Sequence, residues 1–170
     1  MTKLQQSLIE KLYPMLDGEN KIYRQMVDYL LSLGYWPQKL KKKDFSLYFI
    51  HSGKKIAKIE FPKEGIEFLF KFNACKSVPA WCINALLHEE GLPTEADDKW
   101  YHLSTKKCDY SDCSTCGAVK YSYVAKNGGE IFRCTSGAIP LRDIDAIDID
   151  DFKKLATEQH EFFMSLPPSK

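Results

Sequence analysis

The fold is decided by residues 45–61, FSLYFIHSGKKIAKIEF, in which apolar and polar side chains alternate on both sides of a Ser52-Gly53 turn signal. Alternation at every second position is typical of a β-strand that buries one face. The apolar members of this alternation are Phe45, Leu47, Phe49, Ala57, Ile59 and Phe61. After a second turn at residues 62–65, a third strand is predicted over residues 66–72. Together the strands predict an antiparallel meander with one aromatic face.

That aromatic face needs helices to cover it, and three predicted helices flank the meander. Apolar residues at helical spacing predict an amphipathic helix over residues 3–16, whose last turn Pro14 weakens. A second helix is predicted over residues 22–33, ending at Gly34, and a third over residues 77–91. We expect these three helices to form the cover.

Two further elements complete the predicted architecture. Residues 34–37, Gly-Tyr-Trp-Pro, are predicted to form a turn that leads into a lysine-rich loop at residues 39–43. A C-terminal helix is predicted to start at Asp148 or Asp150, because an aspartate at a helix start accepts hydrogen bonds from backbone N–H groups. The predicted fold class is α+β: an antiparallel meander covered by helices, then a cysteine-rich hairpin and a C-terminal helix.

Composition points to a globular protein. The chain has 170 residues, 44% of them hydrophobic, which is enough for one medium domain or one domain with an appendage. The polar connector at residues 92–99 is the candidate boundary, so we expect parts 1–91 and 92–170, packed together as one unit. No apolar run approaches the about 20 residues that a membrane helix needs. With no apolar leader after Met1, the expected compartment is the cytoplasm.

Charge is unevenly distributed along the chain. Residues 20–80 hold 12 basic and 5 acidic side chains, whereas residues 81–170 hold 10 basic and 15 acidic ones. A basic first half suits an anionic ligand, although solvated faces or contact between the halves explain the asymmetry as well.

The chemically sharpest pattern is a set of four cysteines, Cys108, Cys113, Cys116 and Cys134, with the spacing C-x4-C-x2-C-x17-C. Two thiolates that flank a tight turn form a natural half of a tetrahedral zinc site. Alternation around Asn127-Gly128 predicts a β-hairpin over residues 118–134, which would return Cys134 to the neighbourhood of Cys116. The pattern predicts a closed, structural Zn²⁺ site.

Other readings of these cysteines stay open. They could form a disulfide or redox pair, or be inert buried thiols. Their polar and glycine neighbours favour the metal, and His102 is the reserve for Cys108 as fourth ligand. Cys75 and Cys82 lack zinc-turn spacing and are interpreted as buried structural thiols.

Two segments resemble known families. Residues 106–142 resemble a zinc ribbon, departing from it in the second knuckle, where only Cys134 is present. Over residues 20–90, the pattern of residues 45–49, 53–57 and 68–72 resembles small bacterial α+β domains of the YjbR and YdhG type. The second resemblance implies a curved sheet with one face free to receive a ligand, and no functional residue is carried over from it.

The sequence names no reaction. It contains no nucleotide-binding glycine loop, nucleophile elbow or paired-histidine zinc motif, and its four histidines are scattered. The leading hypothesis is a binding module for a small anionic or aromatic ligand. Aromatic rings and lysines are the candidate lining, namely Trp36, Tyr48, Lys58, Lys71, Trp81, Trp100 and Tyr101.

Two alternatives belong to other classes. A nucleic-acid-binding zinc ribbon is the first, and the lysine-rich segment beside aromatic residues favours it, whereas the near-neutral total charge of +1 does not. An enzyme whose residues converge from distant positions is the second. A protein is also kept as a partner in place of a small molecule, and no membrane partner is expected.

Overall fold

The structure is a computed structural model that describes residues 1–42, 44–63, 65–71, 103–104, 120–124, 130–134, 139–141 and 147–166. Its helices are α1 (Lys3–Leu12), α2 (Lys21–Ser32) and α4 (Ile149–Ser165), with 3-10 turns at Tyr13–Leu16 and Gly18–Asn20. Its strands are β1 (Trp36–Lys39), β2 (Ser46–His51), β3 (Lys54–Glu60), β4 (Glu67–Phe70), β5 (Leu103–Ser104), β6 (Lys120–Val124), β7 (Glu130–Cys134) and β8 (Ile139–Leu141). None of the described helices has the length and apolar character needed to cross a membrane.

The strands form two antiparallel sheets. Five strands make the first sheet in the order β1-β2-β3-β4-β8, and three make the second in the order β5-β7-β6. The predicted α+β class and the meander are therefore confirmed, with the first predicted turn at Ser52-Gly53 between β2 and β3. The predicted hairpin over residues 118–134 appears as β6 and β7, in which Cys134 pairs with Lys120.

One predicted turn is wrong. Residues 36–39 form the edge strand β1, which pairs antiparallel with β2, instead of continuing the turn that Gly34 starts. Proline within a short segment argues against a central strand, but Pro37 is tolerated here because β1 lies at the edge of the sheet. The strand takes up Lys39, the first residue of the predicted lysine-rich loop.

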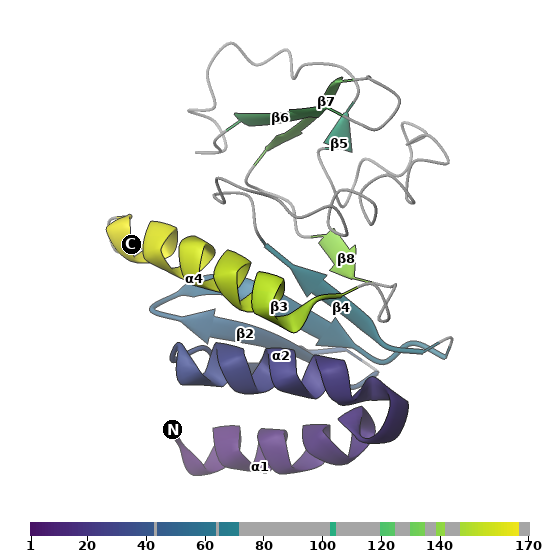
Figure 1. The fold of residues 1–170 in the computed structure, drawn as a ribbon. Coiled ribbons are helices and arrows are strands. Elements are labelled where there is room, and N and C mark those ends of the chain that lie inside the picture. The colour runs from purple at the N-terminus through teal and green to yellow at the C-terminus, as the bar shows by residue number, and fades with distance from the viewer. Residues whose placement is uncertain are drawn as a thin grey trace.

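The helices cover one face of the five-stranded sheet. Figure 1 shows α2 and α4 lying across the same side of this sheet, with α1 next to α2. Phe152 of α4 packs against the rings of Phe68 and Phe70 on β4, with ring centres 6.2 Å and 4.8 Å away. Tyr23 of α2 stacks on Phe68 at 5.8 Å. The C-terminal helix thus joins the two N-terminal ones in the cover, while the predicted helix over residues 77–91 lies outside the described residues.

Strand β8 is hydrogen-bonded both to the sheet and to helix α2. Its backbone pairs with β4, where Leu141 lies opposite Phe68. The buried hydroxyl of Tyr23 donates a hydrogen bond of 2.9 Å to the Leu141 carbonyl oxygen. A buried hydroxyl without a partner would cost free energy, so this bond fixes the place of β8 relative to α2.

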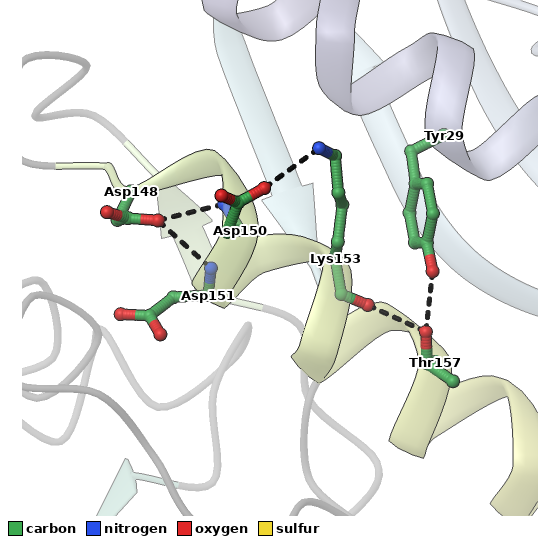
Figure 2. A network of polar contacts seen from close by, with 6 residues as sticks. All are labelled: Tyr29, Asp148, Asp150, Asp151, Lys153 and Thr157. Atoms are coloured by element: carbon green, nitrogen blue, oxygen red, sulfur yellow. Dashed lines mark hydrogen bonds and ion pairs between the residues drawn. The ribbon is translucent and has the colours of Figure 1, made fainter.

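The start of α4 follows the predicted capping. Asp148, one of the two residues predicted to start the helix, accepts hydrogen bonds from the backbone N–H groups of Asp150 and Asp151 at 2.8 and 3.1 Å (Figure 2). Asp150 in turn forms an ion pair of 2.9 Å with Lys153. This acidic run therefore satisfies the helix N-terminus, where negative charge is favourable.

One turn further along α4, a hydroxyl pair links this helix to α2. The Thr157 hydroxyl donates to the Lys153 carbonyl oxygen at 2.8 Å and lies 2.6 Å from the Tyr29 hydroxyl (Figure 2). Because a threonine hydroxyl has one proton to donate, Tyr29 is the donor in the contact between the helices.

A Schellman motif ends α2. The N–H of Gly34 donates to the Leu31 carbonyl at 2.9 Å and the N–H of Tyr35 to the Leu30 carbonyl at 3.0 Å. Gly34 has φ +83°, and a Cβ built there would lie 2.7 Å from Nδ1 of His51. Glycine is therefore required twice, once by the backbone conformation and once by the close imidazole ring.

Replacing this glycine should destabilise the fold. We expect Gly34→Ala to lower the free energy of unfolding by about 1–2 kcal/mol from the left-handed conformation alone. Displacement of the His51 ring adds to that cost. Urea unfolding measures the change, with Gly18→Ala as the matched control, because Gly18 has φ +71° but nothing within 4 Å of a built Cβ. Equal losses in both variants would contradict the role of the His51 contact.

Candidate functional site

The five-stranded sheet has a second face, which points away from the described helices. Cross-strand partners share a face, and the register joins Gln38 to Tyr48, Tyr48 to Lys58, and Lys58 to Leu69. By the same alternation, the second face comprises Trp36, Gln38, Ser46, Tyr48, Ile50, Lys55, Lys58, Glu60, Glu67 and Leu69. All three described helices contribute to the core on the opposite face.

A carboxylate with two lysines lies on this face. Glu60 forms an ion pair with each lysine: one carboxylate oxygen lies 2.6 Å from Nζ of Lys42, and the other lies 2.5 Å from Nζ of Lys58. The Ser46 hydroxyl donates to the same carboxylate at 3.3 Å. Lys58 is only 6% exposed. A buried ammonium of this kind needs a close counter-charge, and Glu60 supplies it.

Glu60 and Lys42 shift each other's pKa. Burial raises the pKa of Glu60, but the hydrogen bonds from Lys42 and Lys58 outweigh it and lower that pKa below its ordinary value. The hydrogen bond to Glu60 raises the pKa of Lys42. The cluster is therefore charged at neutral pH, with two cations for one anion.

An aromatic ring with its own cation lies on the same face. The Lys55 ammonium is 4.4 Å from the centre of the Tyr48 ring, a cation–π contact. Tyr48 is half-buried and Lys55 exposed, so solvent reaches both. Trp36 is half-buried on the neighbouring strand β1. Ring faces and an exposed positive charge are the groups that recognise an aromatic or anionic molecule.

The structure brings part of the predicted lining together. Trp36, Tyr48 and Lys58 lie on the second face, Tyr48 and Lys58 as direct partners across β2 and β3. Lys71 follows β4 and is half-buried, and its N–H continues the ladder by donating to the Ile56 carbonyl at 2.9 Å. The remaining predicted residues, Trp81, Trp100 and Tyr101, lie outside the described residues.

Sequence reasoning missed Lys55 and Glu60, and it placed Lys42 in the lysine-rich loop without its ion pair. Alternation already placed Tyr48 on the polar side of its strand, so the same count along residues 54–60 would have placed Lys58 and Glu60 on one face. Lys42 has no such signal, because its ion pair joins a loop residue to a strand 18 positions away.

The cysteine site falls mostly outside the described residues. Cys134 ends β7, which is the hairpin position expected of it. Cys108, Cys113, Cys116 and the reserve ligand His102 are not among the described residues. Within the described part of the chain, no group of three or more His, Cys, Asp or Glu converges to hold a metal ion.

Comparisons with protein-family models, curated proteins and solved structures found no match to this chain.

The Glu60 cluster should make stability depend on pH. Since the folded pKa of Glu60 is lowered, its contribution is present above the ordinary value of 4.5 and is lost as the pH falls through the folded value. We expect Glu60→Gln to cost about 1–3 kcal/mol at pH 7, and this difference from wild type to shrink below pH of about 4.5.

Urea unfolding of both proteins between pH 7 and pH of about 3 measures this difference. Asp44→Asn, which neutralises an exposed carboxylate two positions after Lys42 in the sequence, is the matched control and should change stability by less than about 0.5 kcal/mol. A cost for Glu60→Gln that stays constant across the pH range would contradict the electrostatic account.

Proposed function

We propose that the protein is a binding module that receives a small anionic or aromatic ligand on the second face, with its cysteine-rich segment held by structural Zn²⁺. The observation that carries the ligand proposal is the Lys55 ammonium over the Tyr48 ring, 4.4 Å from its centre. This pair is open to solvent on a sheet face from which the described helices point away.

The two parts of the face have different roles in this proposal. The buried Lys58 is already paired with Glu60. It therefore holds the strands in place and adds to the electrostatic potential of the face, but it is not the ligand's counter-ion. Lys55 is exposed and contacts the Tyr48 ring, so an anionic group of a ligand can pair with its ammonium. The ring of the ligand then packs against Tyr48 or the neighbouring Trp36.

A ligand screen tests this assignment. On zinc-loaded protein, a thermal-shift panel of mononucleotides, aromatic carboxylates and sugar phosphates should contain a binder that raises Tm. We expect Tyr48→Leu to weaken that binder about fivefold to tenfold or more through the lost ring contact. Lys55→Gln should weaken it about twofold to fivefold, because an exposed charge contributes little.

Lys11→Gln is the matched control, because Lys11 is an exposed lysine on α1, on the other side of the sheet. The absence of any shift across the panel, or a binder that ignores both second-face variants, would count against the proposal. A single-stranded oligonucleotide that binds with steep salt dependence, while mononucleotides do not, would instead favour nucleic-acid binding.

The zinc part of the proposal rests on the donor set. Four thiolates satisfy the tetrahedral preference of Zn²⁺ and leave no position open for water, so the ion would be structural. The antiparallel pairing of β6 and β7, with Cys134 opposite Lys120, supports this, because it returns Cys134 towards the sequence that follows Cys116. Zn²⁺ bound at Cys108, Cys113, Cys116 and Cys134 would stabilise a segment whose described strands form a sheet of three.

Metal analysis tests the zinc site. We expect about one equivalent of zinc in protein purified under reducing conditions without added metal, and a clear loss in Cys108→Ser. Elemental mass spectrometry measures the content, with Cys75→Ser as the control that should keep its zinc. If zinc is lost in His102→Ala but kept in Cys108→Ser, the fourth ligand is His102 and not Cys108. Metal-free wild-type protein would overturn the site.

A further inference from the structure

Two of the four histidines meet beside a buried tyrosine. His51 ends β2, His160 lies on α4, and Tyr35 follows α2. The ring centres of the two imidazoles are 5.5 Å apart, and the Tyr35 ring is 5.4 Å from His51 and 5.6 Å from His160. Both imidazoles are half-buried, whereas Tyr35 is fully buried. A cluster of three such rings at the edge of the core is open to solvent through its histidines.

Local structure at the end of α2 orients this cluster. The left-handed Gly34 turns the chain, and its missing side chain leaves room for the His51 ring, which packs against the glycine. Nδ1 of His51 lies 3.1 Å from the carbonyl oxygen of Leu33. A carbonyl oxygen can only accept, so Nδ1 carries the proton in this contact. In the neutral ring, Nε2 of His51 is then the nitrogen with a free lone pair.

His160 has a matching contact through the same ring nitrogen. Its Nδ1 lies 3.3 Å from the Tyr35 hydroxyl oxygen, which can accept a hydrogen bond. Burial raises the pKa of Tyr35, so this hydroxyl keeps its proton and is a neutral partner. Burial and the neighbouring His51 lower the pKa of His160, which disfavours a pair of adjacent imidazolium ions. In the tautomer that carries its proton on Nδ1, His160 donates to the Tyr35 hydroxyl and its Nε2 keeps a free lone pair, as in His51.

This arrangement is the one that metal-binding histidines use. A ligating imidazole normally donates its other ring N–H to a carbonyl, carboxylate or similar acceptor, which fixes the ring orientation. With metal–nitrogen bonds of about 2.0–2.1 Å and a tetrahedral angle, two imidazoles on one ion have ring centres about 5 Å apart. The observed separation of the two ring centres, 5.5 Å, lies close to that value.

We propose that His51 and His160 bind one exchangeable divalent transition-metal ion through their Nε2 atoms, with Leu33 carbonyl and Tyr35 hydroxyl as outer hydrogen-bond partners. Imidazole suits Ni²⁺, Cu²⁺ and Zn²⁺, and the pair offers them no thiolate or carboxylate. No third side chain of a metal-binding type joins these two within the described ranges. Water therefore completes the coordination, and the ion exchanges readily. The proposed site uses none of the second-face residues and none of the cysteines.

Calorimetric titration with Ni²⁺ tests the site on the full chain loaded beforehand with one equivalent of Zn²⁺. Wild type should bind one Ni²⁺ per chain in an event that His51→Gln and His160→Gln each weaken at least tenfold. His88→Gln, which removes one of the other two histidines, should leave the event unchanged. Tyr35→Phe keeps the ring but removes the outer partner, so about tenfold weaker binding is expected.

Nitrogen NMR of wild-type protein provides a test that needs no variant. On addition of Zn²⁺ beyond the first equivalent, the Nε2 resonances of His51 and His160 should shift together, while Nδ1 of His51 stays protonated. The proposal is overturned if no binding event depends on both histidines, if the shifts fall on other histidines, or if only one of the two rings responds. This measurement uses wild-type protein, so it remains valid even if the glutamine variants do not fold.

Discussion

The packing of Phe152 on Phe68 and Phe70 is the constraint on which the rest of the structure depends. These rings join α4 to β4 across about 80 positions of sequence, and each is fully buried. Burying one such aromatic side chain contributes about 1.5–3 kcal/mol. Because Tyr23 of α2 stacks on Phe68, the two helices and the sheet share one hydrophobic core. The N-terminal meander therefore has its cover completed from the C-terminal end of the chain.

A sheet with one apolar face cannot slip in register. A shift by one residue would turn Phe49 and Phe68 out of the core and bring charged side chains into it. The core therefore also determines the second face, where Tyr48 lies opposite Lys58. Burial of Lys58 then makes Glu60 necessary as its counter-charge. The candidate ligand face is in this sense a consequence of the aromatic core, and its charge pattern follows from register.

Sequence patterns predicted most of the described fold because most of its elements follow from the residues of one short segment. Alternation across residues 45–61 predicted the meander, and the aspartate before α4 predicted its start. Strand β1 was missed because Trp-Pro after a glycine has the composition of a turn, and only pairing with β2 makes it a strand. The ion pair of Lys42 with Glu60 and the meeting of His51 with His160 were beyond reach, since both depend on tertiary contacts.

The histidine pair also bears on how α4 is held. Its first half is fixed by the Asp148 cap, by Phe152 and by the Thr157 contact with Tyr29. In its second half, His160 touches Tyr35 and His51, and Phe163 packs against the core. An ion shared by the two imidazoles would join residues that lie 109 positions apart in the sequence. Since an ion that binds only the folded state stabilises it by mass action, metal supply would act on the stability of α4 without touching the second face.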